Sequence, residues 1–197
     1  MTTQKTAQPD HIIALDIPLP SREELSPETV KYFAACDEKL GLVPNVLQAY
    51  SWNEDKLQAF TALYNDLMLA DSGLSKLERE MIAVVVSAEN KCFYCLTAHG
   101  AAVRELSGDP ALGELMVMNY RVAELSDRHR AMLDFAVALT TMPEDVSEDD
   151  RQELRNAGFS EKDIWDIASV AGFFNMTNRV AAATDMQPNK DYHAKAR

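Results

Sequence analysis

Helix-starting signals recur through most of the chain, and they constrain its fold more than any other feature. Each is a serine, asparagine or aspartate, whose side chain can accept a hydrogen bond from the free backbone N–H groups of a first helical turn. They stand at Ser26, Asn53, Ser75, Asp109, Ser126, Ser147 and Ser160. Apolar residues follow at helical spacing, and beyond residue 25 no strand-like segments alternate with them. The sequence therefore predicts an all-α fold of about eight helices.

The chain divides into three predicted parts. Residues 1–25 contain three prolines and the alternating stretch HIIALDI, which is typical of an extended N-terminal arm with one edge strand. Residues 26–187 form the all-α domain, since a length of 197 residues suits a single domain. Residues 188–197 are left as a C-terminal tail.

A faint internal repeat appears when Ser75 is aligned with Ser160. The alignment then pairs Asn90 with Asn175, and each asparagine follows a capped, very apolar segment. We interpret both asparagines as helix caps and the two copies as pseudo-repeated helical hairpins, with chance similarity as the alternative.

Charge and composition exclude several classes of function. The chain has 19 basic and 31 acidic residues, a formal charge of −12, so binding to nucleic acid or to an anionic membrane is not expected. It has neither a signal peptide pattern nor a long apolar run, which indicates a cytoplasmic protein. Its three cysteines are too few for a disulfide framework, and the isolated Cys36 is interpreted as a core residue.

The other two cysteines belong to the most informative pattern. Cys92, Cys95 and His99 are spaced three and four residues apart, so on a helix they share one face. A cysteine in the first turn lies beside free N–H groups and the positive end of the helix dipole, which favours the reactive thiolate. Glu80 belongs to the preceding apolar segment, where burial would raise its pKa toward that of a general base. Helix-dipole reasoning alone favours Cys92 as the more acidic thiol.

This constellation resembles the alkyl hydroperoxidase D-like branch of the carboxymuconolactone decarboxylase superfamily, and within it the peroxidase-related proteins. The resembling core is EREMIAVVVSAENKCFYCLTAHGAAV, residues 78–103, and the resemblance extends over most of residues 25–187. It implies an all-helical fold, assembly into homo-oligomers (a dimer, trimer or hexamer) and dithiol chemistry without a bound cofactor or metal.

The resemblance also implies a role for each residue of the pattern. Cys95 would attack a hydrogen or organic peroxide and become a sulfenic acid, and Cys92 would condense with it to a disulfide. Glu80 and His99 would relay the proton, and the Tyr94 hydroxyl is a candidate for an additional relay group. An external dithiol, such as a lipoyl carrier or a thioredoxin-like protein, would restore the reduced pair.

Three other functions remain open from the sequence. The protein could exchange thiols with a carrier disulfide as its true substrate, with peroxide incidental. It could be a non-enzymatic oligomer whose packing responds to redox state. A zinc site is the third alternative, although the pattern supplies three of four ligands and would need His129 or Glu80 as the fourth.

Overall fold

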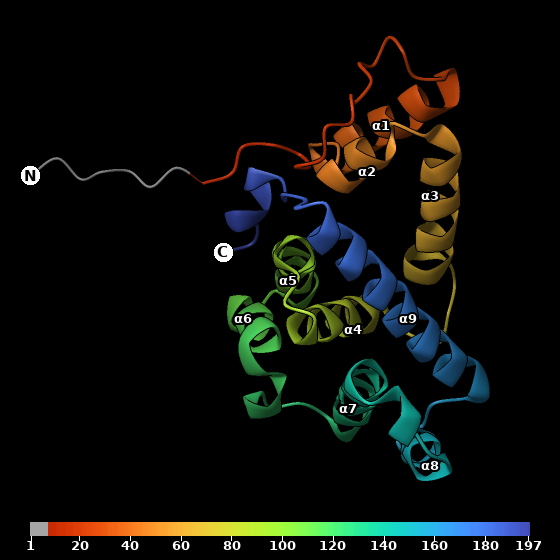
Figure 1. The fold of residues 1–197 in the computed structure, drawn as a ribbon. Coiled ribbons are helices and arrows are strands. Elements are labelled where there is room, and N and C mark those ends of the chain that lie inside the picture. Colours follow the sequence, from red (N-terminus) through yellow and green to blue (C-terminus); the bar gives the residue numbers. More distant parts are fainter. Residues whose placement is uncertain (1–7) are drawn as a thin grey trace, which may run out of the picture.

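The computed structural model describes residues 8–197, and within that range it contains nine α-helices and no β-strand (Figure 1). The α-helices are α1 (Pro27–Leu40), α2 (Asn45–Tyr50), α3 (Glu54–Leu69), α4 (Lys76–Glu89), α5 (Phe93–Ser107), α6 (Pro110–Asn119), α7 (Asp127–Thr141), α8 (Glu148–Asn156) and α9 (Glu161–Ala183). Three short 3-10 helices are η1 (Tyr120–Val122), η2 (Pro143–Asp145) and η3 (Lys190–His193). The all-α prediction is confirmed. None of the helices in this range is long and apolar enough to cross a membrane.

The predicted caps begin the helices as expected. Ser26 accepts a hydrogen bond from the Thr29 N–H at the start of α1, and Asn53 accepts one from the Lys56 N–H at the start of α3. A complete capping box starts α4, in which the Glu78 carboxylate also accepts from the backbone of its N-cap. These local bonds satisfy N–H groups that a first turn leaves free, which explains why they were visible in the sequence.

Helix α4 occupies the centre of the molecule, with α5, α7 and α9 packed around it (Figure 1). Its residues 81–86 are completely shielded from solvent, as is Ile167 of α9. A helix buried on every side holds its neighbours by apolar contact, each buried aliphatic side chain contributing about 1.5–3 kcal/mol. The polar side chains that project from α4 and α9 are therefore held in fixed positions by this packing.

The N-terminal arm differs from its prediction. Among residues 8–25 the stretch HIIALDI forms no edge strand, and residues 1–7 of the predicted arm lie outside the described part. The Ala14 N–H donates to the Thr184 carbonyl (2.8 Å), and the Gln187 N–H donates to the Ile12 carbonyl (3.0 Å). The partner segment is the end of α9 and the turn after it, so the two bonds tie the arm down without a strand ladder.

The predicted repeat is only half realised. Ser75 and Ser160 both open capping boxes, but α9 continues without interruption through Asn175, so the second hairpin does not form. Asn90 stands at the C-cap of α4, whereas the interpretation of Asn175 as a cap is wrong. The two asparagines nevertheless meet, with the Asn90 Nδ2 donating to the Asn175 Oδ1 at 3.0 Å.

Candidate functional site

The two cysteines of the CxxC pattern lie at a sharp reversal between α4 and α5. Lys91 adopts a left-handed conformation (φ 54°), and the Cys92 N–H then donates to the Ser87 carbonyl of α4 (3.0 Å). Helix α5 begins at Phe93, so Cys92 is its N-cap residue and Cys95 its third helical residue. An N-cap side chain faces the free N–H groups of the first turn, which suits it to carry negative charge.

Both thiols are free and buried. Cys92 is 3% exposed and Cys95 is 4% exposed. They belong to a small apolar cluster, which we call the thiol cluster, made up of Ala49, Cys92, Tyr94, Cys95, Ala181 and Met186. Ile12 and Ile13 of the N-terminal arm pack against it. The arm therefore packs against the cluster that contains both thiols. Because both thiols are buried, a large reactant cannot meet either sulfur without some local opening.

The two sulfurs share a proton unequally. A hydrogen bond from the Cys95 thiol, helped by the Cys95 backbone N–H and by the charge on His99, lowers the pKa of Cys92 to about 7 in spite of burial. The same hydrogen bond, together with burial and the negative charge of its neighbour, raises the pKa of Cys95 well above its ordinary value. These effects favour ionisation of Cys92 over ionisation of Cys95.

Glu80 and His99 form the second part of the site. The His99 Nδ1 lies 2.6 Å from the Glu80 Oε2, and each side chain is 13% exposed. The edge of the Phe174 ring packs against the imidazole, with ring centroids 4.7 Å apart. A carboxylate at Nδ1 fixes the tautomer and orientation of the ring and leaves Nε2 for proton exchange. The structure thus brings together Glu80 with His99, and Cys92 with Cys95.

Two buried polar residues of this region were missed from the sequence. Asn178 of α9 is 2% exposed, and its Nδ2 donates to the Ser87 hydroxyl at 3.0 Å. Ser87 is completely buried. The Asn90 Nδ2 donates to the Asn178 Oδ1, also at 3.0 Å. The hydrogen bond with Cys92 and burial raise the pKa of Cys95, and the side chains of Asn178 and Ser87 oppose that rise to a smaller extent.

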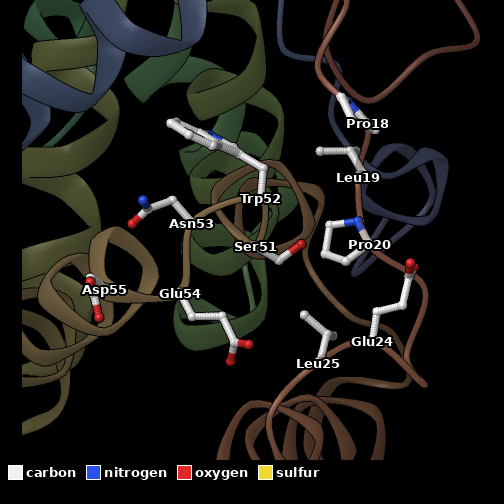
Figure 2. A pocket seen from close by; sticks show the side chains of 10 residues that line it. All are labelled: Pro18, Leu19, Pro20, Glu24, Leu25, Ser51, Trp52, Asn53, Glu54 and Asp55. Carbon is white, nitrogen blue, oxygen red and sulfur yellow. The ribbon is translucent and has the colours of Figure 1, made fainter.

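The Tyr94 ring belongs to the thiol cluster, but its hydroxyl is engaged elsewhere, and the clefts lie away from the cysteines. The Tyr94 hydroxyl accepts a hydrogen bond from the Val46 N–H at the start of α2 (3.0 Å), so it anchors the two helices to each other. Two clefts of about 540 and 410 Å³ lie between the arm and helices α1 to α3, the larger beside Trp52 (Figure 2). Neither is lined by a cysteine. Within residues 8–197 no group of three or more His, Cys, Asp or Glu side chains is arranged to hold a metal ion.

The chain is similar to proteins of known structure over nearly its whole length. The model of the carboxymuconolactone decarboxylase family matches residues 54–111. An uncharacterized peroxidase-related protein from Silicibacter sp. TM1040 is 63% identical, with a TM-score of 0.94, over 98% of this chain and 100% of that one. A peroxidase-related protein from Ralstonia eutropha JMP134, described as an alkylhydroperoxidase AhpD core, is 38% identical, with a TM-score of 0.91, over 97% and 98% of the two chains.

A more distant likeness concerns the fold alone. The debrominase Bmp8 is 21% identical, with a TM-score of 0.77, over 92% of this chain and 96% of its own. The comparison with curated proteins found no match.

Proposed function

Because the chain belongs to the carboxymuconolactone decarboxylase and alkylhydroperoxidase D-like superfamily, we propose that its buried dithiol makes it a thiol peroxidase. The observation that carries this proposal is the placement of two free, buried thiols at the start of α5, together with the hydrogen-bonded pair of Glu80 and His99. A thiolate at neutral pH is the form of cysteine that attacks peroxides, and a second thiol beside it can resolve the product.

We assign the steps as follows. The proton of the Cys95 thiol passes to Cys92 along the hydrogen bond that joins them, and the Cys95 thiolate then attacks one peroxide oxygen. The O–O bond breaks, Cys95 becomes a sulfenic acid, and the departing alkoxide takes a proton relayed by His99 and Glu80. The Cys92 sulfur then attacks the sulfur of the sulfenic acid and displaces its hydroxyl group. That hydroxyl group takes the proton of the Cys92 thiol and leaves as water. One peroxide, one thiol, one thiolate and the relayed proton give one alcohol, one water and one disulfide.

An external dithiol must then reduce the disulfide, and we propose a lipoyl carrier or a thioredoxin-like protein for that role. As the oxidant, a small peroxide needs less opening of the buried thiol cluster than a carrier disulfide does. The later reduction by a carrier requires the larger opening. Comparing the rate of thiol oxidation by lipoamide disulfide with the rate by peroxide tests this choice. A faster reaction with lipoamide disulfide would favour a thiol–disulfide oxidoreductase instead.

We also propose a homo-oligomer. Trp165, Met118 and Val122 are 75%, 79% and 66% exposed, so large apolar side chains are available for contact with a second copy of the chain. Light scattering at micromolar concentration should give a mass that is a multiple of 22.0 kDa. A monomer would contradict the proposal.

The decisive experiment is stopped-flow mixing of the reduced protein with cumene hydroperoxide, followed by a thiol count. We expect two thiols to be lost in the wild type and in Cys36→Ser, which is the matched control. Cys95→Ser should abolish peroxide consumption, and Cys92→Ser should accumulate a sulfenic acid on Cys95 that dimedone traps. Glu80→Gln should slow the loss of thiols, by about 100-fold or more if the pair relays the proton. Peroxide consumption that survives Cys95→Ser would remove the mechanism proposed here.

A further inference from the structure

Cys92 is the residue at which α4 and α5 are joined. Its N–H donates to the Ser87 carbonyl of α4 (3.0 Å), and its carbonyl accepts from the Leu96 N–H in the first turn of α5 (3.0 Å). Just before it, Lys91 has the left-handed conformation (φ 54°) that residues with a side chain rarely adopt. Cys95 lies inside α5 and moves with that helix, whereas the position of Cys92 also depends on how the end of α4 is held.

The end of α4 is attached to α9 by a group of polar side chains that we call the asparagine bridge, made up of Ser87, Asn90, Asn175 and Asn178. The Asn90 Nδ2 donates to the Oδ1 atoms of Asn175 and Asn178, each at 3.0 Å. The Asn178 Nδ2 donates to the Ser87 Oγ, also at 3.0 Å. The bridge therefore holds α4 at two points, at Asn90, two residues before Cys92, and at Ser87, whose carbonyl accepts the Cys92 N–H.

Asn90 supplies both donors at the centre of the bridge. The Asn175 Nδ2 donates to the Thr140 Oγ1 and to the Ala171 carbonyl, so Asn175 presents its side-chain oxygen to Asn90. Asn178, which is 2% exposed, presents its oxygen as well. A carboxamide has two N–H groups, and those of Asn90 match these two acceptors. Because hydrogen bonds are directional, the match fixes the orientation of the end of α4 as well as its distance from α9.

We infer that Asn90 is a positioning residue of the dithiol, one that holds the end of α4 against α9 so that Cys92 stays beside Cys95 while their disulfide forms. The bond from the Leu96 N–H fixes only the carbonyl side of Cys92. The bond to the Ser87 carbonyl fixes its N–H side, and with it the direction in which the Cys92 side chain leaves the backbone. Limiting the motion of one thiol relative to the other raises their effective concentration.

This inference rests on the proposed dithiol chemistry, and it differs from a purely structural role in a measurable way. A bond that only stabilises the fold contributes equally to the reduced and the oxidised protein. A disulfide tolerates a narrow range of backbone geometry, so a bond that positions Cys92 contributes more to the oxidised protein than to the reduced one. By linkage, the loss of such a bond lowers the equilibrium constant for disulfide formation in the folded protein.

The test is equilibration with mixtures of reduced and oxidised dithiothreitol in a Cys36→Ser background, with the protein disulfide counted by mass after alkylation. The protein dithiol and oxidised dithiothreitol give the protein disulfide and reduced dithiothreitol, so the reaction is balanced. We expect Asn90→Ala to lower the equilibrium constant by about five-fold or more, the scale of one net hydrogen bond. Thr177→Val is the matched control, since Thr177 of α9 is buried but bonds only within its own helix, to the Phe174 carbonyl.

The outcomes separate this inference from the proposed function. Urea unfolding of both redox forms should show a larger loss of stability in oxidised than in reduced Asn90→Ala. Equal losses, with an equilibrium constant matching that of Thr177→Val, would overturn the role of Asn90. If Asn90→Ala fails to fold, Asn175→Ala provides the second measurement, because it removes one acceptor of Asn90 and should lower the constant by about two-fold.

The equilibration uses no peroxide. A lowered constant in a protein that does not consume peroxide would therefore support Asn90 and refute the peroxidase. A peroxidase whose constant is unchanged in Asn90→Ala would do the reverse.

Discussion

The distribution of charge within the dithiol leads to a quantitative prediction about pH. The pKa of Cys92 is lowered from an ordinary value of 9.0 to about 7, chiefly by the hydrogen bond from the Cys95 thiol. At about pH 7 roughly half of Cys92 is then thiolate, against about 1% for an unshifted thiol, a difference of about 50-fold. Alkylation by iodoacetamide follows the thiolate, so its rate at Cys92 should rise from about pH 5 and level off above about pH 8.

Removing the S–H donor should reverse this effect. In Cys95→Ala the Cys92 thiolate loses its principal hydrogen bond, so its midpoint should move toward 9.0 and its alkylation rate at about pH 7 should fall by up to about 50-fold. Peptide mass mapping distinguishes Cys92 from Cys36, and Cys36→Ala serves as a control with an unchanged profile. Because alkylation of a buried thiol also requires opening of the site, the comparison is made as a ratio across pH within each variant.

Two results would refute the reasoning. A midpoint near pH 7 that maps to Cys95 would place the resting charge on the other sulfur. A Cys92 midpoint that stays near pH 7 in Cys95→Ala would show that the backbone at the start of α5, and not the neighbouring thiol, controls its ionisation.

Three further predictions concern the frame around the site. Burial opposes the ionisation of Glu78, but hydrogen bonds from Ser75 at the start of α4 and from Arg128 outweigh burial and lower the pKa of Glu78. The ionised carboxylate therefore stabilises the fold above about pH 4.5. That stability is lost as the pH falls through the lowered pKa. Glu78→Gln should therefore cost about 1–3 kcal/mol of unfolding free energy at neutral pH, a difference that urea titrations should show disappearing in acid. Gly113→Ala should cost about 1–3 kcal/mol, because its Cβ would lie 2.4 Å from the Cγ of the buried Arg104, and an unchanged urea midpoint would contradict this. Ile13→Ser should loosen the arm over the thiol cluster and raise the alkylation rate at neutral pH several-fold, with no change in the thiolate midpoint.

The helices could be predicted because their signals are local. A cap such as Ser75 and its partner Glu78 lie three residues apart, so the sequence alone contains the whole interaction. The edge strand at residues 11–17 was wrong for the opposite reason. An alternating pattern forms a strand only beside a second strand, and the segment that meets this arm is the end of a helix. In the same way, Asn175 has the polarity of a cap but lies inside a helix whose apolar contacts continue on both sides of it.

The four residues singled out for chemistry lie on either side of the turn at Lys91, and the structure brings them together as two pairs, Cys92 with Cys95 and Glu80 with His99. Spacing cannot tell which sulfur holds the charge, because that depends on where α5 begins. A helix from about residue 90 places both thiols within its first turns, whereas a start at Phe93 makes Cys92 the cap and sets the N–H of Cys95 against it. Asn178 lies on a distant helix and has no local signal of its own. The alignment of Asn90 with Asn175 indicated this region indirectly, because Asn175 lies one turn from Asn178 along α9 and Asn90 donates to both residues.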